Sequence, residues 1–456
     1  MIIFLIFINR HYKQDVLKAG NEMTEASSEH AWSLRAASAV AGVAVSADGR
    51  CILAGTLGKR VICLDQDGQT LWSAKVGNQA WRVGLSADGE TAIAGTGSTH
   101  PWDMKGRGLY AFNGDGQLRW HQDLGASVWG LALAADGRTV AVGTDGHEAL
   151  LFNGEGHLLW RRKMPGVGWW AWVWAATLSV DGQTAAVGAA NKTVLVLDRG
   201  GNLLGKHGAG ADVMAVSVSA DGQTVAAGST DQQVYLLDRQ GHLLWSEKLD
   251  DKVWTVALTA DGRRLVVGAS EKEAHVRTFD RGGQPLWKRY VEGSVSGVAV
   301  SAGGEVVVVG TRAGHVYLFD STGERLGHHA AQKNIRDVAV SAHGRIAAAA
   351  SEDGHVYGFQ LPLQAAIALP TQRPAWDTTA IRELLTAAFN DEDLTVLCFD
   401  HFRPVYEDFG SGMSKGQKIQ RVLDHCVRHG QIQELLSLVE ERNPAQYTHF
   451  RDRLRR

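Results

Sequence analysis

Tryptophans recur at one place in a repeated pattern of this sequence and are its best candidates for binding chemistry. A tight turn, usually Asp-Gly, recurs along the chain, and Trp often stands seven positions before its first residue. In chain order these eight ring positions hold Ala41, Trp81, Trp129, Trp174, Met214, Trp254, Ser296 and Arg336. Indole rings gathered at one mouth would form an apolar cup, with Arg82, Arg336 and Asp337 as polar contacts for a ligand. Alternatively, the rings only fill gaps in a core.

Two insertions in the repeat carry further tryptophans. Residues 97–106 include Trp102, and residues 166–174 include the pair Trp169 and Trp170. We expect loops of both kinds to open on the face where the innermost strands begin. Exposed aromatic patches are costly without a partner, so we interpret these three tryptophans as part of a binding surface.

Motifs for phosphate transfer and acyl transfer are incomplete. Residues 411–418 resemble a phosphate-binding loop, but neither its second Gly nor the following Lys stands at the required place. In residues 293–297, a Gly-Ser-Val-Ser-Gly run, the serines flank the centre that a nucleophile elbow would need. The sequence also has no His-Glu-x-x-His motif. We therefore expect no catalytic residue.

Histidines are numerous but scattered. His147, His315 and His355 share one place, just after a Gly between the second and third strands of their repeats. A turn position common to the repeats explains them without a metal. The pair His328-His329 could join a site, but we favour the interpretation that both are exposed loop residues. We expect no metal site.

The elements that position these residues repeat eight times. The turns fall at residues 48–49, 88–89, 136–137, 181–182, 221–222, 261–262, 303–304 and 343–344, which gives spacings of 40, 48, 45, 40, 40, 42 and 40 residues. Each unit contains four short runs that are rich in β-branched and aromatic residues. A period of this length, built from short strands and turns, is typical of a β-propeller.

The two ends of the repeat complete each other. Residues 30–34 look like a fourth strand without its first three, whereas the last unit ends after its third strand, residues 354–359. Joining them closes the ring and removes exposed sheet edges. We therefore predict an eight-bladed β-propeller over residues 30–360, closed by the N-terminal strand. Trp32 should take the place that Trp245 occupies in its own blade.

Composition and the N-terminal residues bear on the binding partners and on the cellular compartment. The 456 residues carry a net charge of −3, which gives no argument for nucleic acid or an anionic membrane. The four cysteines form no CxxC pair, which fits a reducing compartment, so we expect a cytoplasmic protein. Eight apolar residues open the chain, too few for a membrane span and poorly placed for a signal peptide. Residues 1–29 are taken as a tail, and Met23 is an alternative start.

Residues 361–376 hold three of the eight prolines and are predicted to be a linker. Residues 377–456 then change to helical spacing and should form a small all-α bundle. We expect Asp377 and Asp391 to cap the first two helices, a loop over 402–412, a third helix from Ser414, and a fourth ending before Pro444.

Charges of opposite sign mark the helical region. Acidic residues precede the third helix and basic residues lie on or near it; the candidates for an adaptor interface are Asp391, Glu392, Asp393, Lys415, Lys418 and Arg421. Opposed charged faces would let like domains stack head to tail. An ordinary solvated surface is the alternative.

Two resemblances follow from these patterns. The runs at 253–262 and 241–245 make the propeller similar to WD-repeat and quinoprotein-like (PQQ-like) propellers. Residues 389–400, 405–406, 413–420 and 425–430 resemble bacterial effector-associated domains, which are death-domain-like adaptors of conflict and signalling systems. That resemblance implies homotypic binding to a similar domain on a protease-like or NTPase effector. Quinoprotein dehydrogenases of this fold use adjacent cysteines, which are absent here, so we expect no cofactor.

We therefore expect a non-enzymatic sensor or scaffold, in which the propeller recognises a ligand or protein and the helical domain recruits an effector. A quinoprotein-like propeller enzyme and a purely structural interaction hub are the alternatives.

Overall fold

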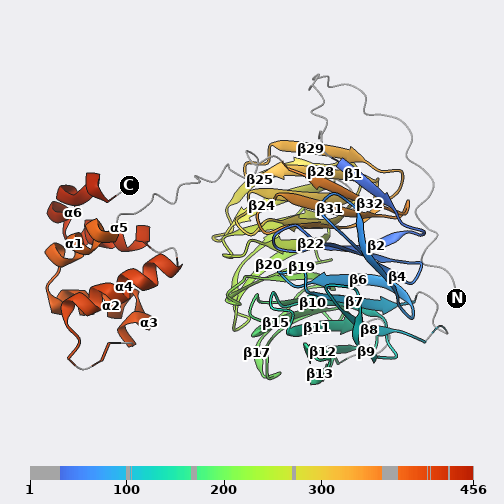
Figure 1. Cartoon of the computed structure of the whole chain (residues 1–456), viewed down its shortest axis with the longest axis horizontal. Coiled ribbons are helices and arrows are strands. Elements are labelled where there is room, and N and C mark those ends of the chain that lie inside the picture. Colours follow the sequence, from blue (N-terminus) through green and yellow to red (C-terminus); the bar gives the residue numbers. More distant parts are fainter. Residues whose placement is uncertain are drawn as a thin grey trace, which may run out of the picture. The chain divides into compact units, whose positions relative to one another are not determined.

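The computed structural model describes residues 31–98, 103, 105–165, 172–269, 274–361, 378–407, 409–410, 412–429 and 432–454. The chain divides into two compact units, residues 1–368 and residues 369–456. The first unit consists of eight four-stranded sheets whose innermost strands pack against one another in a closed ring (Figure 1). The predicted eight-bladed β-propeller is thus confirmed.

Blades 1 to 4 follow one another along the chain, and each runs from its innermost to its outermost strand. Blade 1 has β2 (Val40–Val45), β3 (Ile52–Thr56), β4 (Arg60–Leu64) and β5 (Thr70–Lys75). Blade 2 has β6 (Gln79–Leu85), β7 (Thr91–Gly97), β8 (Gly108–Asn113) and β9 (Leu118–Asp123). Blade 3 has β10 (Val128–Leu133), β11 (Thr139–Thr144), β12 (Glu148–Asn153) and β13 (Leu158–Lys163). Blade 4 has β14 (Val173–Leu178), β15 (Thr184–Ala189), β16 (Thr193–Asp198) and β17 (Leu203–Gly208).

Blades 5 to 7 repeat this order, and blade 8 takes its outermost strand from the other end of the propeller. Blade 5 has β18 (Val213–Val218), β19 (Thr224–Ser229), β20 (Gln233–Asp238) and β21 (Leu243–Lys248). Blade 6 has β22 (Val253–Leu258), β23 (Arg264–Ala269), β24 (His275–Asp280) and β25 (Pro285–Tyr290). Blade 7 has β26 (Val295–Val300), β27 (Val306–Thr311), β28 (His315–Asp320) and β29 (Arg325–Ala330). Blade 8 has β30 (Ile335–Val340), β31 (Ile346–Ser351), β32 (His355–Gln360) and β1 (Ala31–Arg35).

The turn after each innermost strand is built from recurring side-chain chemistry. In blade 1, Ser46 Oγ donates to Asp48 Oδ1 at 2.8 Å and accepts from the backbone N–H of Cys51 at 3.0 Å. Gly49 adopts a φ of 80°, a left-handed conformation that glycine allows without strain. The strand that follows, β3, is buried along its whole length. The recurrent Asp-Gly pairs of the sequence are therefore structural turns.

The closing strand behaves as predicted. Trp32 pairs in register with Gly358, as Trp245 pairs with Leu236 in blade 5. Both indoles also donate across to the next blade, Trp32 Nε1 to the carbonyl of Gln66 at 2.8 Å and Trp245 Nε1 to Arg281 at 2.9 Å. Blade 8 is thus joined to blade 1 through the same contact that joins ordinary neighbours.

The second unit is a small helical bundle. Its helices are α1 (Thr378–Ala388), α2 (Asp391–His401), α3 (Arg403–Glu407), α4 (Lys415–His429), α5 (Ile432–Arg442) and α6 (Pro444–Phe450). They enclose one apolar core that includes Leu384, Leu394, Val422 and Leu435. No helix within the described residues is both long and apolar enough to cross a membrane.

Helix ends in this unit depart from the prediction in three places. Asn390, rather than Asp391, caps α2, because its side chain accepts from the backbone N–H of Asp393 at 2.8 Å. Part of the predicted loop forms the short helix α3. The fourth predicted helix, α5, ends before Pro444 as expected, but Pro444 begins the additional helix α6. Proline fits the first turn because it lacks only an N–H that has no helical partner. Asp377 lies outside the described residues.

Candidate functional site

All eight ring positions lie at β-bulges. In blade 3, Val128 pairs with Thr144 and Gly130 with Gly143, so Trp129 is the extra residue between two consecutive pairs of the ladder. The same register shift falls at the equivalent residue of every other blade. A bulge re-aims the side chain that it carries, and here it recurs at the same position in every blade. The spacing in the sequence therefore identified a defined structural position, although not the bulge itself.

Blades 2, 3 and 4 bring their ring tryptophans together. The ring centroids of Trp81 and Trp129 are 4.7 Å apart, and those of Trp129 and Trp174 are 5.3 Å apart in a T-shaped arrangement. Trp172, which the sequence analysis did not single out, stacks on Trp129 at 5.7 Å and meets Trp174 at 5.1 Å. These four residues form the tryptophan arc. Trp81 is buried while the other three are half-buried, so the arc packs between blades and still presents surface.

Two indole N–H groups of the arc have no described hydrogen-bond acceptor. The Nε1 atoms of Trp129 and Trp174 are buried and have no hydrogen-bond partner among the residues described. Trp81 Nε1, by contrast, donates to Gln79 Oε1 at 3.0 Å. A buried donor without an acceptor is unfavourable by about 1–3 kcal/mol. Trp160 Nε1, in the fourth strand of blade 3, is also buried without a described partner. An acceptor on a ligand would satisfy the donors of Trp129 and Trp174.

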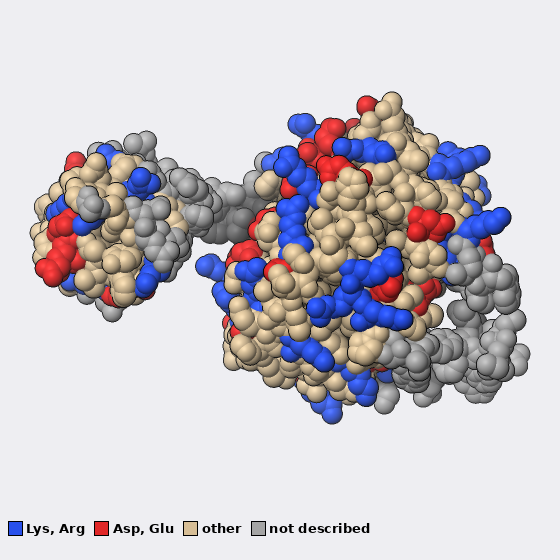
Figure 2. Space-filling model, turned by 90° about the horizontal axis from the view of Figure 1, so that it is seen from below, with Lys and Arg blue, Asp and Glu red and all other residues tan. Residues whose placement is uncertain are grey.

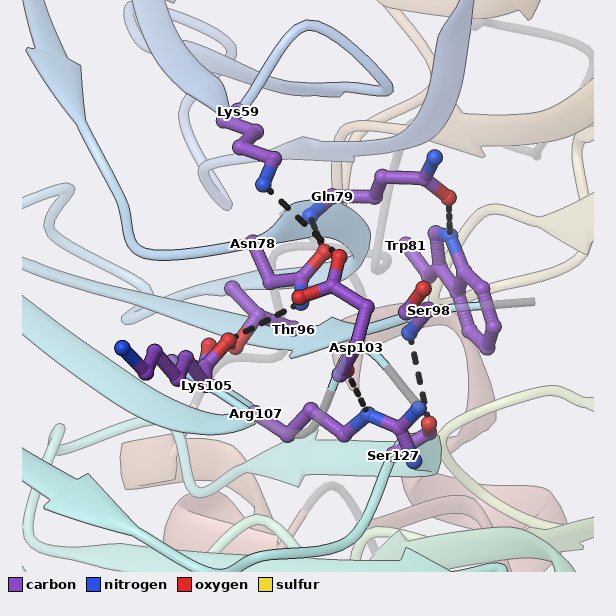
Figure 3. A network of polar contacts seen from close by, with 11 residues as sticks. Lys59, Asn78, Gln79, Trp81, Thr96, Ser98, Asp103, Lys105, Arg107 and Ser127 are labelled. Atoms are coloured by element: carbon purple, nitrogen blue, oxygen red, sulfur yellow. Dashed lines mark hydrogen bonds and ion pairs between the residues drawn. The ribbon is translucent and has the colours of Figure 1, made fainter. Parts of the chain in front are cut away.

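The stem of the blade 2 insertion is tied to the arc by a polar network (Figure 3). The backbone N–H of Gln79, the partner of Trp81, donates to Asn78 Oδ1 at 2.8 Å. Asn78 is fully buried, and its Nδ2 donates to the carbonyl of Lys105 at 3.0 Å. The start of β6 thereby fixes both the indole of Trp81 and the end of the insertion.

A second contact braces the same insertion from β8. Arg107 is buried, and its Nε donates to the carbonyl of Asp103 at 2.6 Å. The carboxylate of Asp103 lies 3.9 Å from Lys59 Nζ in blade 1. The predicted surface residues Trp102, Trp169 and Trp170 lie outside the described residues.

Three of the remaining ring positions lie outside the arc and make contacts of their own. The guanidinium of Arg312 lies over the ring of Trp254, 5.5 Å from its centroid, and Trp254 is half-buried. Arg336 is exposed and pairs with Glu352 at 2.7 Å. Ser296 donates from Oγ to the carbonyl of Ile335 at 2.6 Å.

Two of the predicted polar contacts join neighbouring innermost strands. Arg82 Nε donates to the carbonyl of Trp129 at 2.7 Å. Asp337 Oδ2 accepts from the backbone N–H of Val43 at 3.2 Å, across the seam between blades 8 and 1. Burial raises the pKa of Asp337, although the charge of Arg82 opposes that shift. Arg82 thus links blades 2 and 3, and Asp337 links blades 8 and 1.

The interpretation of His328 and His329 as exposed loop residues was wrong, because both lie in β29 and are partly buried. His328 Nε2 lies 3.0 Å from His315 Nδ1, and its ring stacks on Tyr317. His329 packs against Tyr357 at 4.5 Å. Burial lowers the pKa of both histidines. Within the described ranges, no three or more His, Cys, Asp or Glu side chains converge as a metal site.

Charges in the helical unit are partly used internally. Lys418 Nζ lies 2.8 Å from Asp391 Oδ2, and Lys415 Nζ donates to the carbonyl of Thr386 at 2.6 Å. These residues therefore do not lie on two opposed free faces, as the sequence had led us to expect. Glu392, Asp393 and Arg421 are exposed, and Figure 2 shows both signs of charge on the visible face of this unit.

An apolar surface on the helical unit escaped the sequence analysis. Val396 and Phe399 of α2 are 46% and 45% exposed, which is unusual for large apolar side chains in so small a domain. The Phe399 ring meets Tyr406 edge-on at 5.1 Å, and the guanidinium of Arg403 lies over it at 4.4 Å. Leu394 and Leu397 already occupy the core, so the apolar residues of α2 cover two sides of the helix.

Comparisons with known proteins agree with both units. A family model described as outer membrane protein assembly factor BamB, of the PQQ type, matches residues 58–212 and 190–396. A model described as effector-associated domain 7 matches residues 381–444. The crystal structure of the computationally designed Ika8 protein is similar in fold, with a TM-score of 0.60 and 20% identity over 72% of this chain and 98% of that one. None of the curated proteins compared with the chain matches it.

Proposed function

Because this chain belongs to the PQQ-type propeller family described as outer membrane protein assembly factor BamB, and carries an effector-associated domain at its C-terminus, we propose that it is a sensor scaffold. The combination of a propeller with an effector-associated domain is that of a protein-interaction scaffold. In the proposed function, the tryptophan arc binds a ligand or protein and the helical unit recruits an effector with a similar domain. The scaffold itself performs no catalysis and acts in the cytoplasm of a bacterium in conflict or signalling.

The observation that carries the proposal is the uneven filling of one repeated position. Every blade has the same bulge, so the backbone of the fold is alike at all eight ring positions. Ala41 and Ser296 show that the bulge forms with small side chains. Three consecutive blades nevertheless hold tryptophan, and two of these rings keep an N–H donor without a described acceptor. Binding explains this arc better than folding does, because large aromatic residues with polar edges are favoured at binding sites.

Recruitment rests on the C-terminal unit. Its effector-associated domain supports contact with proteins that carry a related domain, and the exposed α2 surface offers apolar area for it. Protease-like or NTPase effectors are the partners that we propose. No nucleic acid or membrane enters this proposal.

The test is affinity capture from the producing cells with the tagged full chain. We expect a captured protein with a helical domain similar to residues 381–444, and its loss when residues 369–456 are deleted. Trp129→Ala combined with Trp174→Ala should instead remove partners of the propeller and leave that protein bound. Met214→Ala changes the same bulge in blade 5 and is the matched control. If no protein with a related domain depends on residues 369–456, recruitment is excluded.

A further inference from the structure

One side of α2 carries a stripe of exposed residues. Glu392, Val396, Phe399 and Arg403 are all exposed, and they follow one another at steps of four, three and four residues. Such steps place side chains on one side of a helix. Arg403 begins α3, but its guanidinium lies over Phe399 and so stays on this side. These four residues form the α2 stripe.

The flanks of the stripe are already occupied. Asp391 on one flank pairs with Lys418, and Asp400 on the other pairs with Arg442 at 3.2 Å. The opposite side of α2, with Leu394, Leu397 and Cys398, is buried in the core. The apolar centre of the stripe therefore lies between internally paired charges and faces away from the domain.

The order of residues in the stripe is self-complementary. An acidic residue stands at one end, a basic residue at the other, and two apolar residues lie between them. We propose that two copies of the chain associate through this stripe, with their α2 helices antiparallel about a twofold axis between Val396 and Phe399. Val396 of one copy then packs on Phe399 of the other, and Glu392 faces Arg403 at both ends. An isologous contact of this kind needs no second surface.

The proposed contact is small, so we expect it to be weak. Two crossing helices bury less than the ~1,200 Å² at which stable interfaces begin, so the dimer should be weak, with a Kd on the order of tens of micromolar. Charge at the two ends then decides orientation and partner more than affinity does. The inference goes beyond the proposed function, because it concerns copies of this chain and needs no effector.

Sedimentation equilibrium of the full chain, from about 1 to about 200 µM, tests the proposal in the affinity range expected for such a contact. The wild-type chain should show a concentration-dependent dimer. Glu392→Arg and Arg403→Glu should each raise the dimer Kd by about tenfold or more, because both ends of the contact then bring like charges together. The double exchange should restore most of the affinity, since each end again pairs opposite charges.

Asp393→Arg is the matched control. Asp393 lies in the same first turn of α2, is exposed, and points to a flank rather than along the stripe, so the same charge change there should leave the dimer intact. Phe399→Ala should dissociate it, and an unchanged circular dichroism spectrum shows that the fold is kept. A chain that stays monomeric throughout overturns the proposal. So does a dimer that Asp393→Arg weakens as much as Glu392→Arg, or one that the double exchange fails to restore.

Discussion

The backbone N–H of Ala342 in blade 8 donates to the carbonyl of Ala47 in blade 1 at 3.0 Å. This bond completes a ring of eight, in which the turn after each innermost strand donates to the equivalent turn of the next blade at 2.8 to 3.2 Å. The first and last parts of the propeller sequence are thus joined at two places, which we call seams. One is this backbone ring at the centre, and the other is β1 at the rim.

Loss of the rim seam should open the edge of blade 8 without unfolding the centre. Trp32→Ala removes a half-buried indole and its bond to Gln66, so we expect a loss of about 2–4 kcal/mol in the free energy of unfolding. Trp245→Ala removes the equivalent ring from a blade whose four strands are continuous in the chain. Urea unfolding should show similar losses for both variants.

Proteolysis separates the two variants. Only Trp32→Ala should make the segment around β1 rapidly cleavable, because β1 alone is held to its blade by pairing and not by a hairpin turn. Equal cleavage of both variants would mean that β1 contributes no special closure.

The unpaired indoles of the tryptophan arc should tolerate loss of their N–H groups. Trp129→Phe and Trp174→Phe remove a buried donor that lacks a described acceptor, so we expect unfolding free energies within about 1 kcal/mol of wild type. Trp72→Phe is the control, since Trp72 Nε1 donates to the carbonyl of Gly114 at 2.8 Å and its loss should cost about 1–2 kcal/mol. Thermal or urea unfolding measures the difference. Equal losses at all three positions contradict the prediction.

The sequence predicted most where one feature was repeated eight times. A single Asp-Gly turn is weak evidence, but eight of them at a nearly constant spacing defined the blades, the ring position and the place of Trp32. The bulge at that position was out of reach, because register belongs to a pair of strands and not to one strand's residues. His328 and His329 of blade 7 were misplaced for a related reason. Gly327 stands where most fourth strands have Trp, as Gly205 does in blade 4, so the strand with His328 lacked its marker.

The helical unit has no repeat, and prediction there was correspondingly less complete. Apolar spacing found its main helices and the core residues, such as Leu384 and Leu435. It could not tell that Lys418 folds back onto Asp391, since the pair is separated by 27 residues and its contact depends on how α2 and α4 pack. Exposure of Phe399 was hidden for the same reason, because an apolar residue in a helix is usually assigned to the core.

Cys51 should be the reactive thiol of the folded protein. It is half-buried, whereas Cys63, Cys398 and Cys426 are buried, and none of the four forms a disulfide. A hydrogen bond with Cys63 lowers the pKa of Cys51, while that bond and burial raise the pKa of Cys63. Burial also raises the pKa of Cys398 to about 12.

Because the thiolate is the nucleophile, a disulfide reagent at neutral pH should modify one thiol per native chain, identified by mass spectrometry as Cys51. Cys51→Ala should abolish the fast phase, and urea should expose the other three thiols. Fast labelling of Cys63 or Cys398 in the native chain would contradict this assignment.

His329 should make the propeller less stable in acid. Burial lowers the pKa of its imidazole, and its Nε2 has no hydrogen-bond partner among the described residues. The unfolded chain binds a proton near pH 6.5, whereas the folded chain does so only at lower pH. Its contribution to stability is therefore complete above about pH 6.5 and declines as the pH falls below that value.

His329→Phe keeps an aromatic ring against Tyr357 but cannot be protonated. Urea unfolding at about pH 7.5 and about pH 5.5 should show a smaller acid loss for this variant than for wild type. His157→Phe, at an exposed turn, is the control and should leave the acid loss unchanged. An equal acid loss in all three proteins would assign it to other groups.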